Sequence, residues 1–337
     1  MEEIITMAHG AGGSQTARLI ADIFTAEFDS PYLTRDDAAV LDSPGGRMAM
    51  TTDGFVVSPP FFRGGNIGKL SVCGTVNDLA CMGAQPLWLT ASFILEEGFP
   101  VAKLREIARS MAQTARRAGA HIVSGDTKVV GHGQCGGVFI TTSGVGRIAD
   151  APGAAALGGA QVKAGDAVLV TGDIGRHGCA ILLARGEYGI EAAVDSDCAP
   201  LWEPVRRMLA TGAAIHAIRD ATRGGVGTVL GEIAGQSGTC VELEEAAIPV
   251  DDGVRGVCGL LGLDPLYMAC EGRMVVFAPA AAADRLLEAL HGCPEGAGAA
   301  RVGEVTAEMP GRVVVRTPAG GRRMLAMPGG ELLPRIC

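Results

Sequence analysis

Residues 64–84, GGNIGKLSVCGTVNDLACMGA, decide the fold of this chain. The stretch begins as a glycine-rich loop and continues as a helix, with Asp78 near the carboxyl end of that helix. Its first half is close to a phosphate-binding P-loop, but the spacing is wrong and Leu70 stands where serine or threonine is required. We therefore reject a Walker-type nucleotide site and expect a loop and helix that present Asp78.

The segments that flank this helix alternate between strand and helix patterns. We expect a glycine-rich loop and helix over 9–24, a strand that starts near residue 47 and ends at Asp53, and strands over 87–95, 120–130 and 136–146. Residues 101–119 have a helical period with Gly119 as the C-cap. The apolar face of that helix comprises Leu104, Ile107, Ala108, Met111, Ala115 and Ala118.

The second half of the chain repeats this alternation after a small, glycine-rich stretch at 151–165. We place the domain boundary in that stretch. Strand, helix and strand–turn–helix patterns follow, and the whole predicts an α/β or α+β protein of two similar-sized units. The predicted domains are residues 1–150 and 151–327, followed by a flexible tail at 328–337. The strands at 166–172, 240–250, 273–279 and 300–306 accompany helices at 176–186 and 281–292 and a strand–turn–helix unit at 214–235.

The composition excludes several classes of protein. The 337 residues are 48% hydrophobic and 19% charged, so the chain can bury a large core and is not globally disordered. A net charge of −9 without a basic stripe disfavours a nucleic-acid partner. We find no run of about 18 apolar residues, no signal peptide and no CxxC pair among the ten cysteines. A reducing cytoplasm fits this cysteine usage best.

Aspartates next to glycine or threonine recur along the chain, most of them after an apolar strand. A single one is most often a turn or helix-cap residue, but the recurrence in both halves indicates chemistry. Mg²⁺ prefers such hard oxygen ligands and shares them with phosphate oxygens. Lys128 and Arg223 are candidates for contacting phosphate. The candidate metal ligands are Asp36, Asp37, Asp53, Asp78, Asp126 and Asp220.

The opening glycine-rich loop holds a further candidate site. Its residues include His9, Gly10, Gly12 and Gly13. Backbone N–H groups of such a loop can surround phosphates. The alternative interpretation is a frayed terminus without function.

These motifs together resemble the hydrogenase-maturation carbamoyl dehydratases, the HypE family. The resemblance runs from the first residues to the last, in near-unbroken order, and the terminal PRIC distinguishes this family from its relatives. It implies a two-domain, aminoimidazole ribonucleotide synthetase-like fold whose N-terminal domain binds ATP and forms a dimer sheet or barrel. The motifs are MAHGAGG, TTDGF, GGNIGKLSVCGTVNDLACMGA, FILEEG, SGDTKVV, DATRGGV, RGVCGLLG, CEGRMV and PRIC.

The resemblance also implies a reaction at the last residue, Cys337. In the family a carbamoyltransferase, HypF, loads this thiol with a carbamoyl group. ATP then drives dehydration of the S-carboxamide to a thiocyanate. The cyanide passes to iron on a HypC–HypD scaffold and becomes a ligand of the [NiFe]-hydrogenase site. The implied partners are therefore HypF, HypC–HypD and a second copy of the chain, and the implied cofactors are ATP and Mg²⁺.

The resemblance favours Glu271 as the base, because it matches an acidic position of the family's active site, and the chemistry of the other candidates suggests their roles. Glu271 is the favoured general base, His9 is the second candidate, and Asp78 also contacts the substrate group. The nucleotide-binding set is Asp53, Asp126, Lys128, Asp220, Arg223, Gly12 and Gly13.

Two other functions stay open at this point. One is a small-molecule kinase or synthetase of the same ATP-binding superfamily with an incidental tail, and the other is a non-enzymatic adaptor. The tail from Gly329 to Cys337 spans at most about 30 Å when extended, which is enough to leave the body and return to a pocket.

Overall fold

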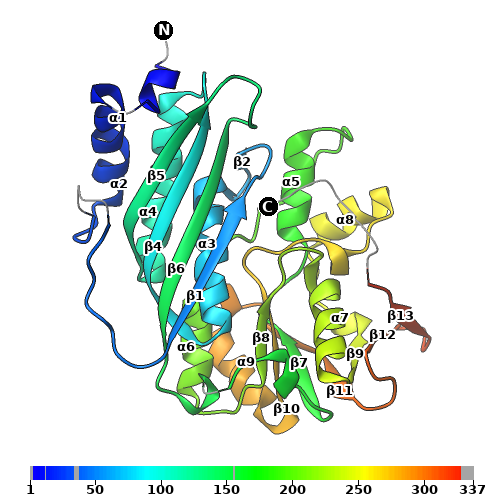
Figure 1. Ribbon diagram of the computed structural model, residues 1–337. Helices are drawn as coiled ribbons and strands as arrows, with labels where there is room; N and C mark the ends of the chain where they lie inside the picture. Colours follow the sequence, from blue (N-terminus) through cyan, green and yellow to red (C-terminus); the bar gives the residue numbers. More distant parts are fainter. Residues whose placement is uncertain (1–2, 12, 34–37, 155, 328–337) are drawn as a thin grey trace.

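The computed structural model describes residues 3–11, 13–33, 38–154 and 156–327 (Figure 1). Of the predicted site residues, Gly12, Asp36, Asp37 and Cys337 lie outside the described residues, as does the predicted tail at 328–337. The described chain contains two main sheets, each packed against helices, as the alternation of patterns predicted.

The first sheet is four-stranded, in the order β1-β6-β4-β5. β4 and β5 are parallel, and the other two pairings are antiparallel. Helices α3 (Ile67–Cys81) and α4 (Val101–Ala118) lie behind the strands in Figure 1. The strands are β1 (Met48–Phe55), β4 (Ala84–Glu96), β5 (His121–Val130) and β6 (Val138–Ile148).

Helix α4 follows its sequence pattern closely. All six residues of the predicted apolar face are buried. Gly119 caps the helix in the left-handed conformation, with φ of 74°, which glycine adopts without steric cost. The prediction for this helix is confirmed.

Helix α3 is buried on nearly every side because it lies between the first sheet, α4 and the second half of the chain. Asn66 caps its first turn, since the Asn66 side-chain oxygen accepts hydrogen bonds from the N–H groups of Gly68 and Lys69. At Gly68 the helix approaches α4 so closely that a Cβ would overlap the carbonyl oxygen of Ile107. The decisive stretch of sequence is therefore the central helix of the molecule.

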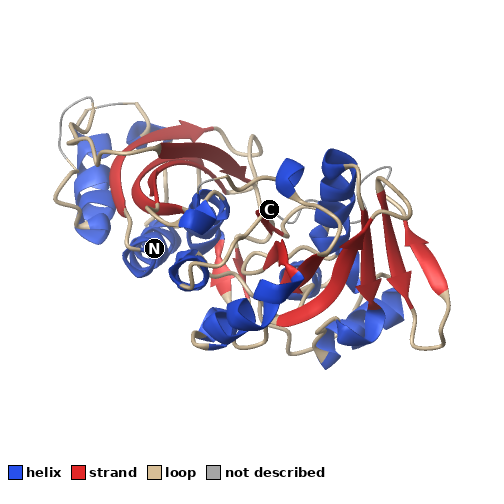
Figure 2. Ribbon diagram, turned by 90° about the horizontal axis from the view of Figure 1, so that it is seen from below, coloured by secondary structure: helices blue, strands red, loops and turns tan. Residues whose placement is uncertain are grey.

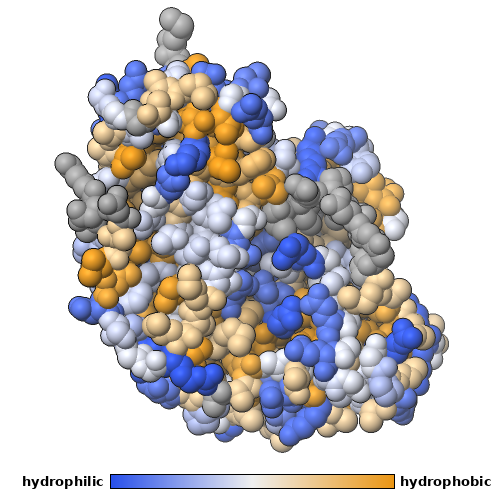
Figure 3. Space-filling model, viewed as in Figure 1, coloured by the Kyte–Doolittle hydropathy of each residue, from blue (hydrophilic) through white to orange (hydrophobic). Residues whose placement is uncertain are grey.

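The face of the first sheet that points away from α3 and α4 is open to solvent. Along β1, the exposed residues Met48, Met50 and Thr52 alternate with less exposed residues that point toward α3. On β4, Ile94 belongs to the same outer face. Figure 3 shows apolar surface over the upper part of this sheet. We call the whole outer face of this sheet, which includes Met48, Met50, Thr52 and Ile94, the open face.

The second sheet has seven strands in the order β13-β12-β9-β11-β7-β10-β8. Helix α7 (Gly225–Ser237) covers one face, and α6 (Trp202–Ala210) and α9 (Ala283–His291) cover the other. Figure 2 shows helices on both sides of these strands. The strands are β7 (Asp166–Val170), β8 (Ala217–Asp220), β9 (Cys240–Glu244), β10 (Met274–Pro279), β11 (Ala300–Thr306), β12 (Arg312–Arg316) and β13 (Arg322–Leu325).

The remaining elements lie at the edges of these two layers. α5 (Arg176–Arg185) packs on α8 (Asp252–Leu261), and β2 (Phe61–Phe62) pairs with β3 (Gly65–Asn66). Near the N-terminus, α1 (Ser14–Leu19) continues through a π-helical turn (Ile20–Thr25) into α2 (Ala26–Phe28). No helix in the described part of the chain has the length and hydropathy needed to cross a bilayer.

The structure differs from the sequence prediction in several places. The expected strand over 240–250 ends at Glu244, where a 3-10 turn begins. Helices α6 and α8 and the strands β2, β3, β12 and β13 were not predicted. Asp53 and Asp126 lie inside strands and not at strand ends, since both β1 and β5 continue beyond them.

Hydrophobic contacts cross the boundary between the two halves. Ile181 and Cys198, from the second half, belong to the core beneath the first sheet. Ala80 and Cys81 of α3 belong to a core of the second half. The two halves therefore share buried surface along α3.

Candidate functional site

Three predicted aspartates meet where α3 joins the two halves. Asp53 comes from β1 and points toward α3, Asp78 comes from α3, and Asp220 is the last residue of β8. The Thr51 hydroxyl donates a hydrogen bond to Asp78 Oδ2 over 2.7 Å, which fixes that carboxylate against β1. We call Asp53, Asp78 and Asp220 the carboxylate cluster.

The negative charge of the cluster disfavours the ionised forms of Asp220 and Asp53. Burial, together with the charges of Asp78 and Asp53, raises the pKa of Asp220 to about 6. Burial and the Asp78 charge also raise the pKa of Asp53, while Arg223 opposes that rise. The cluster is therefore a focus of negative charge that a cation would relieve.

Glu271 lies beside this cluster in the segment that leads into β10. Its side chain is 2% exposed, and Oε1 has no hydrogen-bond partner within the described residues. Burial first, and then the nearby carboxylates of Asp220, Asp197 and Asp53, raise the pKa of the Glu271 carboxyl well above its usual range. A buried carboxyl with a raised pKa and a free oxygen has the properties of a general base or acid.

Arg223 supplies positive charge at the same place. It lies in the turn between β8 and α7, and it is exposed to solvent. Its charge acts on Asp53 of the first half. Arg223 is therefore placed to contact an anion that approaches the carboxylate cluster.

Asp126 and Lys128 do not join this cluster. Both lie on β5 and point to the open face, on the side of the sheet opposite Asp53. The Lys128 ammonium pairs with Asp126 over 2.9 Å, and this pairing lowers the pKa of Asp126. A phosphate that bound Lys128 would compete with that ion pair.

The described part of the N-terminal loop lies beside β5. His9 ends a 3-10 turn (Met7–His9), and its Nδ1 accepts a hydrogen bond from the backbone N–H of Thr6 over 3.0 Å. Gly10 packs against Val129 of β5, and Gly13 precedes α1 with φ of 85°. The structure therefore groups His9 and Gly13 with the β5 edge and not with the carboxylate cluster.

The chemistry of the carboxylate cluster fits Mg²⁺, because the donors are hard oxygens. Within residues 3–11, 13–33, 38–154 and 156–327, no three His, Cys, Asp or Glu side chains converge to hold one metal ion. Magnesium commonly takes only one or two protein carboxylates and fills its octahedron with phosphate oxygens and water.

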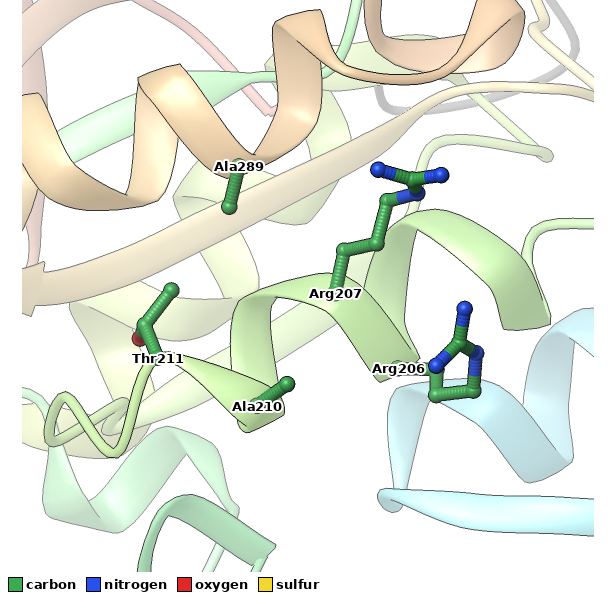
Figure 4. Close-up of a pocket in the computed structure, with 5 residues that line it drawn as sticks. All are labelled: Arg206, Arg207, Ala210, Thr211 and Ala289. Carbon is green, nitrogen blue, oxygen red and sulfur yellow. The ribbon is translucent and has the colours of Figure 1, made fainter.

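A separate surface hollow of about 370 Å³ lies between α6 and α9. Figure 4 shows Ala289 of α9 facing the residues of α6 that line the hollow. Its two arginines, Arg206 and Arg207, both donate hydrogen bonds to Glu203. None of the predicted site residues lines this hollow.

The structure adds two residues that the sequence reasoning missed, Asn77 and Asp197. Asn77 precedes Asp78 on α3, and Asp197 lies in the loop before α6; both contact the backbone around Glu271. Asn77 is the neighbour of Asp78 in the stretch 64–84, so that stretch itself carried a signal. The segment around Asp197 has no pattern that separates it from an ordinary acidic loop.

Comparisons with known proteins agree with this fold. The family model described as "AIR synthase related protein, N-terminal domain" matches residues 35–148, and its C-terminal counterpart matches residues 163–316. Carbamoyl dehydratase HypE of Rhodobacter capsulatus is 50% identical over 339 aligned residues, which cover 100% of this chain and 99% of the relative. The Escherichia coli K12 protein of the same name is 46% identical and covers 99% of both chains.

Solved structures give the same result. The hydrogenase maturation protein HypE in complex with ATP superimposes with a TM-score of 0.93 and 44% identity, over 98% of this chain and 99% of that one. A HypE–HypF complex superimposes with a TM-score of 0.81 and 42% identity, over 92% and 99% of the two chains. A thiamine-monophosphate kinase from Stenotrophomonas maltophilia, at 22% identity and a TM-score of 0.63, shares the fold.

Proposed function

We propose a mechanism for this chain from the premise that it belongs to the HypE carbamoyl dehydratase family. It is an ATP-dependent carbamoyl dehydratase of hydrogenase maturation. The observation that supports a local mechanism best is the buried, unpartnered Glu271 oxygen beside the carboxylate cluster.

The reaction converts an S-carboxamide on Cys337 into a thiocyanate. The carboxamide oxygen attacks the γ-phosphorus of ATP, ADP leaves, and the nitrogen loses one proton. The C–O bond then breaks, phosphate departs with its oxygen, and the nitrogen loses its second proton to give the C≡N bond. The balance is one carboxamide and one ATP consumed for one thiocyanate, ADP and phosphate. Because phosphate is a far better leaving group than oxide, the phosphorylation makes the loss of oxygen possible.

The described residues divide this work between charge and proton transfer. Asp53, Asp78 and Asp220 would supply ligands to the Mg²⁺ ions, with one or two carboxylates to each ion, and bound Mg²⁺ neutralises phosphate charge. Arg223 would contact the phosphates. Glu271 would take a nitrogen proton, which requires its carboxylate form.

The other predicted site residues stay part of the proposal. Asp126 and Lys128 would meet nucleotide from the β5 edge, where His9 and Gly13 also lie. His9 remains the second candidate for the base. Gly12, Asp36 and Asp37 keep their proposed roles as phosphate and metal ligands, and Cys337 keeps its role as carrier.

The open face would bind a second copy of the chain to form a homodimer. Its exposed methionines, Met48 and Met50, are the kind of surface that associating sheets bury. The described cysteines are free thiols, which fits the proposed cytoplasmic location. HypF would load Cys337, and HypC–HypD would receive the cyanide.

Cys337 can be tested directly by intact-mass spectrometry. The full chain is carbamoylated by HypF and then given ATP and Mg²⁺. We expect the adduct to lose the mass of one water, and Cys337→Ala to bind ATP normally but yield no thiocyanate.

Two controls complete this test. Cys135→Ala removes another thiol that is not fully buried, and it should leave dehydration unchanged. Deletion of residues 329–337 should abolish dehydration. If ATP is consumed while the wild-type adduct keeps its mass, the dehydratase mechanism is wrong. Turnover of a free small molecule by the deletion variant would instead support the kinase alternative.

A further inference from the structure

The backbone of Glu271 is held from both sides by side chains and loops of the two halves. On its amide side, the Glu271 N–H donates to Asp197 Oδ1 over 3.1 Å. On its carbonyl side, the Glu271 oxygen accepts from the backbone N–H of Ala199 over 3.3 Å and from Asn77 Nδ2 over 3.4 Å. The side-chain Oε1 is the part of the residue that the described chain leaves without a partner.

Asn77 connects this arrangement to the central helix. Its amide nitrogen also donates to the carbonyl of Ala199 over 3.0 Å, and its oxygen accepts from the N–H of Leu201 over 2.7 Å. Asn77 is 2% exposed, so none of these hydrogen bonds is shared with bulk water. One side chain of α3 therefore fixes both the loop before α6 and the segment that carries Glu271.

The next residue, Gly272, shows how tightly the segment is held. A Cβ at this position would overlap the carbonyl oxygen of Asp197. The close approach explains why glycine is needed there without any unusual backbone angle. Glu271 thus has little freedom to shift relative to Asp197 and Asn77.

We infer that Asn77 and Asp197 are positioning residues that hold the Glu271 backbone so that its free carboxyl oxygen faces the reacting carboxamide. This inference rests on the proposed role of Glu271 as the base. Neither residue needs to touch substrate, because each acts through the peptide groups of Glu271 and Ala199. Because Asn77 precedes Asp78 on the same helix, the base and one proposed metal ligand share a single rigid support.

The test changes Asn77 and Asp197 one at a time. It compares the single-turnover dehydration rates of the carbamoylated full chains. Asn77→Ala and Asp197→Ala should slow water loss by about tenfold to a hundredfold, since small misplacement of a reacting group has effects of this size. The ATP dissociation constant should stay unchanged. Asp197→Asn keeps an oxygen that accepts the Glu271 N–H but removes a charge that raises the Glu271 pKa, so it should recover most of the rate on the high-pH plateau of the rate profile.

A matched control separates positioning from general stability. Asn66 is also a buried asparagine, but it is the N-cap of α3, and its side-chain oxygen accepts hydrogen bonds from Gly68 and Lys69 in the first turn. Asn66→Ala should lower the melting temperature and leave the dehydration rate unchanged. If Asn77→Ala is no slower than Asn66→Ala, or if Asp197→Asn is as slow as Asp197→Ala, the positioning role is wrong.

Hydrogen–deuterium exchange gives a readout that does not depend on the reaction. The amides of the segment 270–273 should exchange faster in Asp197→Ala than in wild type, and Asp197→Asn should restore protection. Unchanged exchange in Asp197→Ala would overturn the inference. A wild-type adduct that never loses water would instead overturn the proposed function, and the exchange experiment would still decide whether Glu271 is held.

Discussion

Buried carboxylates of the cluster destabilise the folded protein when they are ionised. Asp220 is the clearest case, because burial and its neighbours raise its pKa to about 6. A raised carboxyl pKa means that the folded protein binds a proton more tightly than the unfolded chain does. The stability from this group is therefore fully present below the usual pKa of about 3.9 and is lost as pH rises through about 6.

Asp220→Asn should therefore stabilise the metal-free protein at pH 8 by about 2–3 kcal/mol, with little effect near pH 4. Thermal melting in the presence of a chelator measures the difference. The exposed Asp42 is the control, since Asp42→Asn should change neither value. An equal gain for Asp220→Asn at both pH values would contradict the role of the buried charge.

The sequence singled out Asp53, Asp78, Asp220, Arg223 and Glu271 as candidates, because each lies in a recognisable motif, and the structure brings them together. It could not show that Asp126 and Lys128 face away from the cluster. Strand alternation fixes that direction only when the register is known, and a bulge shifts the register of β5 against β4. Asp197 and Asn77 were missed because their role depends on contacts between segments far apart in the chain.

Among the elements, α3 has the tightest packing constraint. Gly68→Ala should destabilise the protein by about 1–3 kcal/mol, because the new methyl group would overlap Ile107 of α4. Urea unfolding measures this loss. Gly256→Ala on α8 is the matched control: that helical glycine has open space around it, so alanine should stabilise by about 0.5–1 kcal/mol. A neutral Gly68→Ala would show that the two helices can separate without cost.

The elements that could be predicted had a clear periodic spacing of apolar residues. α4 shows six apolar residues on one face, and all of them are buried. α6 was missed because Pro204 in its first turn reads as a helix breaker, although proline is tolerated there. β12 and β13 are short strands flanked by arginines, and they gain their stability from pairing with distant β9 and with each other.

At the scale of the whole molecule, the open face should govern assembly. Met50 is 77% exposed near the middle of β1, so Met50→Glu would place like charges within a dimer formed through this face. We expect the variant to sediment as a monomer, because such juxtaposition costs several kcal/mol. Leu260→Glu, at an equally exposed position on α8, should leave the dimer intact. A dimeric Met50→Glu protein would place the interface elsewhere.

The interlocking of the two halves along α3 has a consequence for how such a protein can evolve. Ile181 and Cys198 complete the core of the first half, while Ala80 and Cys81 complete a core of the second. A chimaera that joined the N-terminal half of one homologue to the C-terminal half of another would have mismatched hydrophobic contacts in both of these cores. Recombination should therefore give folded chimaeras only when the two parents share the residues that pack across the two halves. For the same reason, the sequences of the two halves should diverge together.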